Sequence, residues 1–437
     1  MSLLRWLPGA GGPPDTWRPR PDARALDHLR VEDEDDEDDS LPLPWAIPAC
    51  AQVLERAAPE RIRLPRSARI AGLARVARSW LDPDDPSRVE ALTVLPDELG
   101  LSPAMVAWGL DRAFEVITPD ALEGWWQRAA PKSEVPAGPT GHVWSGNVFV
   151  AGLPPVFAAV LAGRGALVKA PSAHPTFAAL LAQSFALHAP ELGPSVGAAA
   201  WGREDVRSTD ALLALDPVFA FGDDASIAAL ADRSGGALHG FGHRVSTSVV
   251  TDELDDAALI GLWEDALAYD GGGCLTPRWV FVLGDARALA ERLAAVGDAA
   301  AEVLPGRPLS DAAATRRAQY VGAAGFGGWA RAGRGWCVAV QAGLQPAPPP
   351  RTLCLIPVDD LSDVARTLAP LGPRLQGVAA SGVPRAELQE ALAGSGVARI
   401  CGVGELQRPP LDWDHDGVDI LGAMGSSSTR EPQTTTE

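Results

Sequence analysis

The sequence predicts an α/β protein whose sheets are largely parallel and are covered by helices on both faces. Three observations predict this class. Short apolar runs alternate with amphipathic helical segments along the body of the chain. Turns rich in Gly, Asp and Ser connect strand to helix. The 437 residues, of which 46% are hydrophobic, are enough for two domains with buried cores.

The first strand–helix–strand unit is predicted over residues 142–188. Residues 142–150 are expected to be extended, and a helix that starts with proline follows over 154–161. Glycines end this helix before a short strand over 166–169. Over 175–188 apolar residues recur at helical spacing, which predicts a second helix.

The same succession is predicted twice more along the chain. In each case a strand leads through a polar turn into a helix, and the helix leads back to a strand. The glycine-rich turn before the last of these strands contains Cys274. The expected strands cover 196–201, 217–221, 244–250 and 278–283, and the expected helices cover 227–232 and 252–268.

A further α/β unit is predicted near the carboxyl end. Its expected strands cover 336–340, 351–358, 375–380 and 398–401, with helices over 360–368 and 385–393. The glycine-rich run over 322–335 lacks the GK[ST] ending of a phosphate loop and follows no strand. It is therefore expected to be a mobile loop.

Two terminal segments, residues 1–44 and 425–437, are expected to be disordered tails. Their composition offers too little apolar surface to offset the entropy of ordering. Eight consecutive acidic residues from Glu32 to Asp39 carry a large share of the net charge of -19. The rest is mildly acidic and has no stripe of Lys and Arg, so no nucleic-acid partner is expected.

The chain also lacks the signals of membrane and secreted proteins. It has no apolar run of about 18 residues, so no membrane span is expected. Prolines, glycines and arginines break its first 20 residues, unlike a signal peptide, and a cytoplasmic location is expected. The five cysteines are widely spaced with no CxxC pair, which indicates neither a disulfide framework nor a zinc site.

Cys274 is the candidate nucleophile. A cysteine attacks as its thiolate, which requires access and positive potential, and the preceding Gly271–Gly273 lets backbone amides approach the sulfur. The alternative is a small buried core residue. That second interpretation is kept for the other four cysteines, Cys50, Cys337, Cys354 and Cys401.

Four segments follow one another in an order typical of a known superfamily. They are GHVWSGNVFVAGLPPVFAAVLAGRGALVKAPSAHPTFAALLA (141–182), FAFGDDASI (219–227), GHRVSTSVV (242–250) and DGGGCLTPRWVFV (270–282). In this order they resemble the cofactor-binding core, the turn beside the nicotinamide, the linking strand and the nucleophile segment of the aldehyde dehydrogenase superfamily.

Further motifs narrow the resemblance to one branch. The motifs WGREDV, FGDDASIAAL, GFGHRVS, GGGCLTPR and GELQRPPLDWDHDG are similar to the acyl-CoA reductases that include the reductase of bacterial luciferase operons. The resemblance covers about Trp45 to Met424 and implies an aldehyde dehydrogenase-like fold. A Rossmann-like cofactor domain is then expected over 45–245 and an α/β catalytic domain over 246–401, with the active site between them. A return segment over 402–424 is expected to pack across both.

The resemblance implies catalytic roles for two residues. The side-chain amide of Asn147, with the backbone N–H of Cys274, would donate to the oxyanion that forms when the thiolate attacks a thioester. The alternative for Asn147 is a turn residue. Oxidative members carry a Glu that activates water in the strand before the nucleophile, whereas the corresponding stretch here, 241–244, has none. This absence favours reduction.

The resemblance also implies a nicotinamide cofactor. Lys169 ends a strand and would reach the adenosine ribose or its 2′-phosphate, although an exposed lysine without a role is the alternative. Ser172 and Arg203 would contact the 2′-phosphate, which favours NADPH and leaves NADH as an alternative. Gly222 and Ser226 lie in the turn expected beside the nicotinamide.

The function that follows is NADPH-dependent reduction of a fatty acyl-CoA, or of an acyl-carrier thioester, to the aldehyde through an acyl-cysteine on Cys274. Two alternatives stay open. One is other chemistry of the superfamily, either aldehyde oxidation or acyl phosphate reduction. The other is an inactive binding or scaffold protein on this fold. The acyl chain length, the carrier and the oligomeric state, monomer or homo-oligomer, are left open.

Overall fold

The computed structural model describes residues 5–6 and 43–425 and divides into two compact units. Unit 1 comprises Met1–Glu98, Ala113–Gly242 and Leu411–Glu437, and unit 2 comprises Leu99–Arg112 and His243–Pro410. Most of the two tails for which disorder is expected lies outside the described residues. In the part of the chain that is described, no helix has both the length and the apolar composition needed to cross a membrane.

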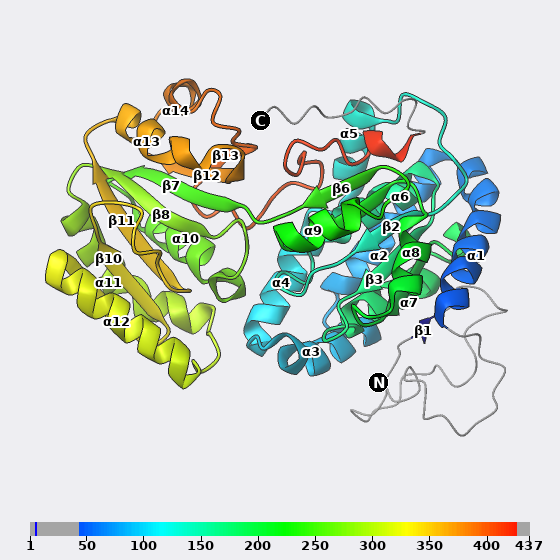
Figure 1. Cartoon of the computed structure of the whole chain (residues 1–437), viewed down its shortest axis with the longest axis horizontal. Helices are drawn as coiled ribbons and strands as arrows, with labels where there is room; N and C mark the ends of the chain where they lie inside the picture. Colours follow the sequence, from blue (N-terminus) through cyan, green and yellow to red (C-terminus); the bar gives the residue numbers. More distant parts are fainter. Residues whose placement is uncertain (1–4, 7–42, 426–437) are drawn as a thin grey trace. The chain divides into compact units, whose positions relative to one another are not determined.

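Unit 1 contains a six-stranded sheet with the order β1-β4-β3-β2-β5-β6 (Figure 1). All neighbouring strands are parallel except β1, which pairs antiparallel with β4. The strands are β1 (Arg5–Trp6), β2 (Thr140–Val143), β3 (Ala166–Ala170), β4 (Val196–Ala200), β5 (Val218–Phe221) and β6 (Leu238–Phe241). Disorder is expected for residues 1–44, but residues 5–6 form β1 and pair with β4 in the sheet.

Helices cover both faces of this sheet. α1, α8 and α9 pack on one face through apolar residues such as Leu54 and Leu212, and α6 and α7 cover the other, with α2 outside them. An aromatic cluster packs among α2, α6, α7 and the end of α4; its members are Trp80, Phe157, Phe177 and Phe114. The helices of unit 1 are α1 (Leu43–Arg63), α2 (Arg66–Leu81), α3 (Pro86–Leu99), α5 (Pro119–Ala129), α6 (Leu153–Ala162), α7 (Thr176–His188), α8 (Val206–Leu213) and α9 (Asp224–Ala231). α4 (Pro103–Glu115) belongs to unit 2 as far as Arg112 and to unit 1 after it.

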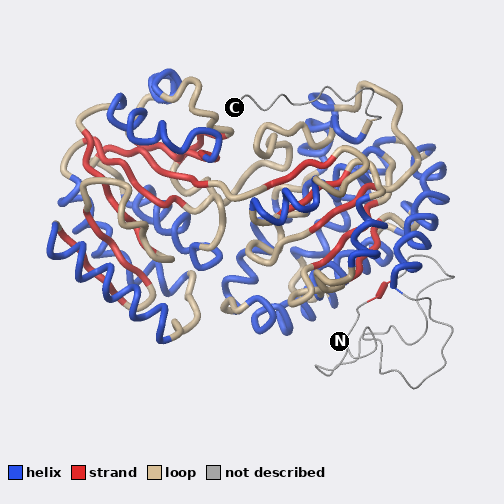
Figure 2. The backbone as a smooth tube through the Cα atoms, in the orientation of Figure 1, coloured by secondary structure: helices blue, strands red, loops and turns tan. Residues whose placement is uncertain are grey.

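Unit 2 contains a seven-stranded sheet with the order β13-β12-β7-β8-β11-β10-β9, drawn in red between helices in Figure 2. Only β9 runs antiparallel to its neighbour. The strands are β7 (Val245–Thr251), β8 (Pro277–Leu283), β9 (Trp329–Gly333), β10 (Trp336–Val340), β11 (Thr352–Val358), β12 (Leu375–Ser381) and β13 (Arg399–Gly402).

Helices also enclose the sheet of unit 2. α10 (Asp256–Leu267) and α11 (Ala286–Val303) lie on the face that carries Trp336. α12 (Asp311–Gly327), α13 (Leu361–Leu368) and α14 (Arg385–Ala391) pack on the opposite face. Short irregular turns, η4 (Ala268–Gly271) and η5 (Ala369–Arg374), follow α10 and α13 and contain residues with positive φ.

Most predicted elements after residue 150 are confirmed, and two expectations are wrong. Residues 322–335 are not a loop, because α12 extends to Gly327 and β9 follows it. The extended segment expected over 142–150 is a strand only as far as Val143. No element is predicted above for 43–129, which forms α1 to α5; α1 and α3 contain internal prolines, which normally end a helix.

The units also differ from the expected division in two places. Residues 99–112 belong to unit 2, where Trp108 packs edge-to-face on Tyr269 and donates from Nε1 to Glu264 at 3.2 Å. The return segment is split, since 402–410 belongs to unit 2 and the residues after it to unit 1. Within unit 1, the backbone oxygen of Met424 accepts from the buried Arg164 at 3.1 Å.

Candidate active site

The candidate cofactor residues lie at one edge of the unit 1 sheet. Because the strands are parallel, their carboxyl ends share an edge, and nucleotides bind there near the point where the strand order reverses. The chain proceeds from β2 to β3 and β4 in one direction, whereas β5 and β6 lie on the other side of β2. The structure brings to this edge the candidates that follow β2 to β5: Asn147, Lys169, Ser172, Arg203, Gly222 and Ser226.

Lys169 and Arg203 form a positively charged pair at this edge. The Lys169 Nζ lies 5.3 Å from the centroid of the Trp201 ring, a cation–π contact. Burial lowers the pKa of Lys169, the nearby charge of Arg203 lowers it further, and Glu204 opposes the shift. The positive charge at this edge favours an anion there, and Glu204 already supplies one negative charge nearby. Sequence reasoning missed Trp201, although it begins the WGREDV motif directly after β4.

The turn after β5 is organised by a helix cap. Asp223 accepts from the backbone N–H of Ser226 at 2.8 Å and from its hydroxyl at 3.0 Å, which caps α9. These hydrogen bonds, with a smaller effect of the charge of Arg203, hold the pKa of the Asp223 carboxyl below its usual range. The Ser226 hydroxyl is therefore used within the cap, and the exposed carboxylate of Asp223 stands beside Gly222.

Asn147 is exposed in the bend between β2 and α6. The bend is closely packed, because a Cβ atom on the preceding Gly146 would lie 2.8 Å from Cδ2 of His174. A larger residue at position 146 would require the His174 ring to move, so the bend that carries Asn147 packs against the loop after β3. The location in a turn agrees with both interpretations of Asn147, and its role stays a prediction.

Cys274 lies in unit 2, in the turn between η4 and the amino end of β8. It is half-buried, whereas the other four cysteines are buried. The Ser246 hydroxyl, at the start of β7, donates to the backbone oxygen of Cys274 at 2.9 Å. The backbone N–H of Thr276 donates to the oxygen of Gly273 at 3.1 Å and closes the turn. These bonds fix the backbone on the carboxyl side of the cysteine.

The electrostatic surroundings separate Cys274 from the other cysteines. Arg278 lies close enough for charge interaction with the sulfur: burial lowers the pKa of Arg278, and Cys274 opposes that shift. A neighbouring guanidinium favours a thiolate. Burial instead raises the pKa of the Cys337 thiol to about 11 and those of Cys354 and Cys401 to about 12. Their thiols stay protonated at neutral pH.

Asp265 is a functional candidate that sequence reasoning missed. It lies on α10, fully buried, and its carboxylate accepts from the backbone N–H of Gly404 at 2.8 Å and of Gln407 at 3.3 Å. The Gln407 side-chain amide lies 3.3 Å from the Thr276 hydroxyl. Burial raises the pKa of Asp265 to about 7. The signal in the sequence is a carboxylate among the apolar residues of a helix, together with the GELQR motif that it binds.

Comparison with known proteins identifies the family. A model of the family described as Acyl-CoA reductase (LuxC) matches residues 66–426. The chain belongs to this family. A curated relative, "Long-chain acyl-protein thioester reductase 2" of Photobacterium leiognathi, is 29% identical over 160 residues, which are 35% of this chain. That match spans 33% of the relative's length. The resemblance stated from the motifs is thus confirmed.

Similar solved structures confirm the fold class. Aldehyde dehydrogenase 21 of Physcomitrella patens, in complex with the reaction product succinate, matches with a TM-score of 0.66 at 15% identity, over 87% of this chain and 89% of that one. The 1-pyrroline-5-carboxylate dehydrogenase from Thermus with bound NAD matches with a TM-score of 0.62 at 15% identity, over 87% and 84%. The fold is aldehyde dehydrogenase-like, with two sheets that are mostly parallel.

Proposed function

We propose that this protein reduces an acyl thioester, of CoA or of an acyl carrier protein, to the aldehyde with NADPH, through an acyl-cysteine on Cys274. The observation that carries the proposal is the contrast among the cysteines. Cys274 is half-buried in a glycine turn beside Arg278, whereas the other four are buried. Membership of the acyl-CoA reductase family supports a thioester as the substrate.

In the proposed reaction, the Cys274 thiolate attacks the thioester carbonyl. A bond forms between Sγ and the acyl carbon, and the bond from that carbon to the carrier sulfur breaks, so that the carrier leaves as its thiol after taking a proton. NADPH, when bound, supplies a hydride to the acyl carbon. The resulting thiohemiacetal breaks at its bond to Sγ, which releases the aldehyde and restores the thiolate. The Asn147 amide and the Cys274 N–H are proposed to donate to the oxyanion.

The charges at the unit 1 edge support a phosphate-bearing cofactor. Burial and, after it, the charge of Arg203 lower the pKa of Lys169, while Glu204 opposes the shift; a phosphate beside the two cations would add further negative charge. We assign the 2′-phosphate of NADPH to this pair together with Ser172, which is exposed directly after β3. Gly222 and Ser226 are proposed to line the nicotinamide end, with Ser226 acting through its backbone because its hydroxyl caps α9.

Reduction is favoured over oxidation by the residues before β7. The stretch 241–244 reads FGHR and contains no carboxylate to activate water. An acyl-enzyme that is protected from hydrolysis persists until hydride reaches it. The same stretch argues against aldehyde oxidation that ends in hydrolysis of the acyl-enzyme.

A steady-state assay with matched cysteine variants tests the proposal. Acyl-CoAs from short to long are supplied with NADPH or NADH, aldehyde formation is measured, and the acyl-enzyme is sought on Cys274 by peptide mass spectrometry. Cys274→Ala should abolish reduction with an unchanged melting temperature, whereas Cys401→Ala, in which a buried thiol is removed, should retain it. Turnover by folded Cys274→Ala would exclude the covalent mechanism. Failure to bind either nicotinamide cofactor would favour the scaffold alternative.

A further inference from the structure

Three consecutive residues before the nucleophile turn have left-handed backbone conformations. Tyr269 has φ 51° and ψ 34°, Asp270 has φ 54° and ψ 28°, and Gly271 has φ 71°. Such a conformation costs a residue other than glycine roughly 1–2 kcal/mol and persists only where the surroundings impose it. The strained turn ends three residues before Cys274. Its position next to the candidate nucleophile points to a functional reason for the strain.

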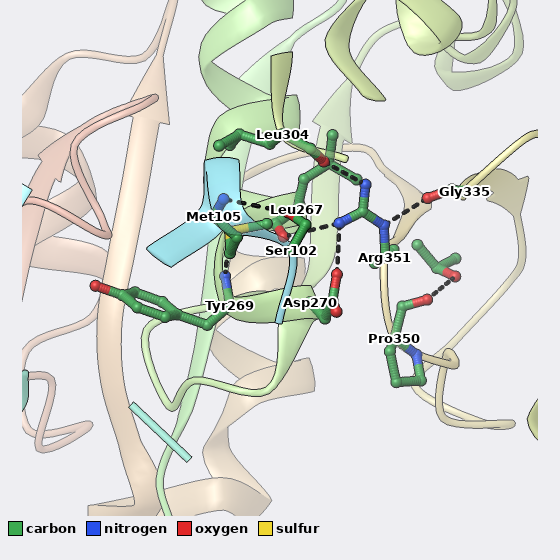
Figure 3. Close-up of polar contacts among 10 residues, drawn as sticks. Ser102, Met105, Leu267, Tyr269, Asp270, Leu304, Gly335, Pro350 and Arg351 are labelled. Atoms are coloured by element: carbon green, nitrogen blue, oxygen red, sulfur yellow. Dashed lines mark hydrogen bonds and ion pairs between the residues drawn. The ribbon is translucent and has the colours of Figure 1, made fainter. Parts of the chain in front are cut away.

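The side chain of Arg351 holds this turn from one side (Figure 3). Its Nη1 donates to Oδ1 of Asp270 at 2.7 Å and to the backbone oxygen of Leu267 at 3.3 Å. Its Nη2 donates to the oxygen of Leu304 at 2.7 Å, and its Nε to the oxygen of Gly335 at 2.6 Å. Arg351 is 4% exposed. One buried cation therefore joins the end of α10, the strained turn, the segment after α11 and the turn between β9 and β10.

The other contacts of the turn are equally close. The backbone N–H of Tyr269 donates to Sδ of Met105 at 3.1 Å, as Figure 3 shows, and the Tyr269 ring packs edge-to-face on Trp108. A Cβ atom on Gly271 would lie 2.9 Å from the backbone nitrogen of Arg351. Arg351 itself has φ 59°. The two strained segments are thus packed against each other, backbone against backbone.

We propose that Arg351 is a positioning residue for the nucleophile, because its hold on the strained turn of Tyr269–Gly271 sets the direction in which the chain reaches Cys274. This inference rests on the proposed function of Cys274. Between Asp270 and Cys274 the chain has only glycines, which have no side chains to pack and many accessible conformations. Ser246 fixes the carboxyl side of the cysteine. Arg351 supplies the corresponding anchor on the amino side.

An arginine is required at this place for a geometric reason. The guanidinium is a planar fork whose three nitrogens reach four acceptors here. A lysine would keep the charge opposite Asp270 but could not reach the three carbonyl oxygens together. Burial lowers the pKa of Arg351 and the Asp270 carboxylate opposes that shift, so the cation stays paired. With lysine at this position, the turn would be free to relax toward unstrained angles.

The test compares Arg351→Lys and Asp270→Asn with a matched control, Arg366→Lys, whose arginine is exposed on α13 and pairs with Asp363. On the full chain, three quantities are measured: the rate at which an acyl-CoA acylates Cys274 without cofactor, the rate at which iodoacetamide alkylates it, and the melting temperature. Acylation should fall about 10²-fold in Arg351→Lys, the effect of misplacing a reacting group by about 1 Å. Alkylation should change less than about 3-fold, because iodoacetamide needs only access to the sulfur and does not depend on its orientation toward a bound substrate. Arg366→Lys should behave as the wild-type protein.

Asp270→Asn keeps the size of the side chain and an oxygen that can accept from Arg351, so it should fold even where Arg351→Lys does not. We expect its acylation rate to fall about 10-fold, from weakening a charge-assisted hydrogen bond by about 1–2 kcal/mol. Wild-type acylation rates in folded Arg351→Lys or Asp270→Asn would overturn the inference while the proposed function stands. A parallel loss of acylation, alkylation and folded protein would assign Arg351 a merely structural role. Absence of acylation at Cys274 in the wild-type protein would instead refute the proposed function, and the inference with it.

Discussion

The buried carboxyl of Asp265 should make the stability of the protein depend on pH. Burial raises its pKa from 3.8 to about 7, and hydrogen bonds from Gly404 and Gln407 only partly oppose the shift. Between these two values the folded protein binds the proton more tightly than the unfolded chain does. The contribution of Asp265 is therefore most favourable below pH 3.8 and declines as pH rises toward 7. Three pKa units correspond to about 4 kcal/mol in total.

The experiment compares the wild-type protein with Asp265→Asn, which has no proton to titrate. Urea unfolding from pH 4.5 to 7.5 gives the free energy of unfolding of each. The wild-type value minus the variant value should fall by about 3 kcal/mol across this range. Gln389→Ala, which changes an exposed side chain on α14 that has no titratable proton, serves as the control and should give a flat difference. A flat difference for Asp265→Asn as well would refute the reasoning, because the carboxyl would then titrate as it does in the unfolded chain.

Two further predictions concern the unit 1 edge. Asn147→Ala should lower the single-turnover rate of reduction by about 10²- to 10³-fold, the loss typical of one oxyanion donor, with alkylation of Cys274 unaffected; a full rate in a stable variant would exclude the oxyanion role. Arg203→Ala should raise the KM for NADPH by about 10-fold, the loss of one charged hydrogen bond, and leave that for NADH unchanged, whereas Arg207→Ala should change neither. An equal rise for both cofactors in Arg203→Ala would remove the assignment to the 2′-phosphate.

Elements with strong local signals could be predicted from the sequence. The strand over 336–340 coincides with β10, and the strand over 166–169 ends one residue short of β3, because short apolar runs between turn residues fit a buried strand. The α12–β9 region shows the limit. The glycines of the run 322–335 predict a loop, yet Tyr320, in the same helix, packs on Cys337 and Ala339, and β9 pairs along β10. Those partners come from outside the helix, so its own sequence does not reveal them.

For the candidate site, too, some features could be predicted from the sequence and others could not. The gathering of Lys169, Ser172 and Arg203 at one edge follows from parallel strands, whose carboxyl ends coincide whatever the side chains are. A cap in the turn over 222–226 follows from its Asp and Ser residues, whereas the Lys169–Trp201 contact depends on side-chain geometry. No strand or helix period contains that information. The sequence therefore predicts where a nucleotide site would form better than it predicts which atoms would line it.

The surroundings of Cys274 show why the residues that position it are the hardest to predict. A cysteine after three glycines cannot be oriented by its neighbours in the chain, so the groups that fix it must come from elsewhere. Arg351 is 81 residues from Asp270 along the sequence, and Gln407 is 131 residues from Thr276. The sequence around Arg351, PPPRTLC, contains no signal that distinguishes it from an arginine in an exposed loop. Buried charges and left-handed residues both cost stability, so stability does not explain why the protein keeps them around this turn. The proposed requirement to aim the Cys274 thiolate would explain both.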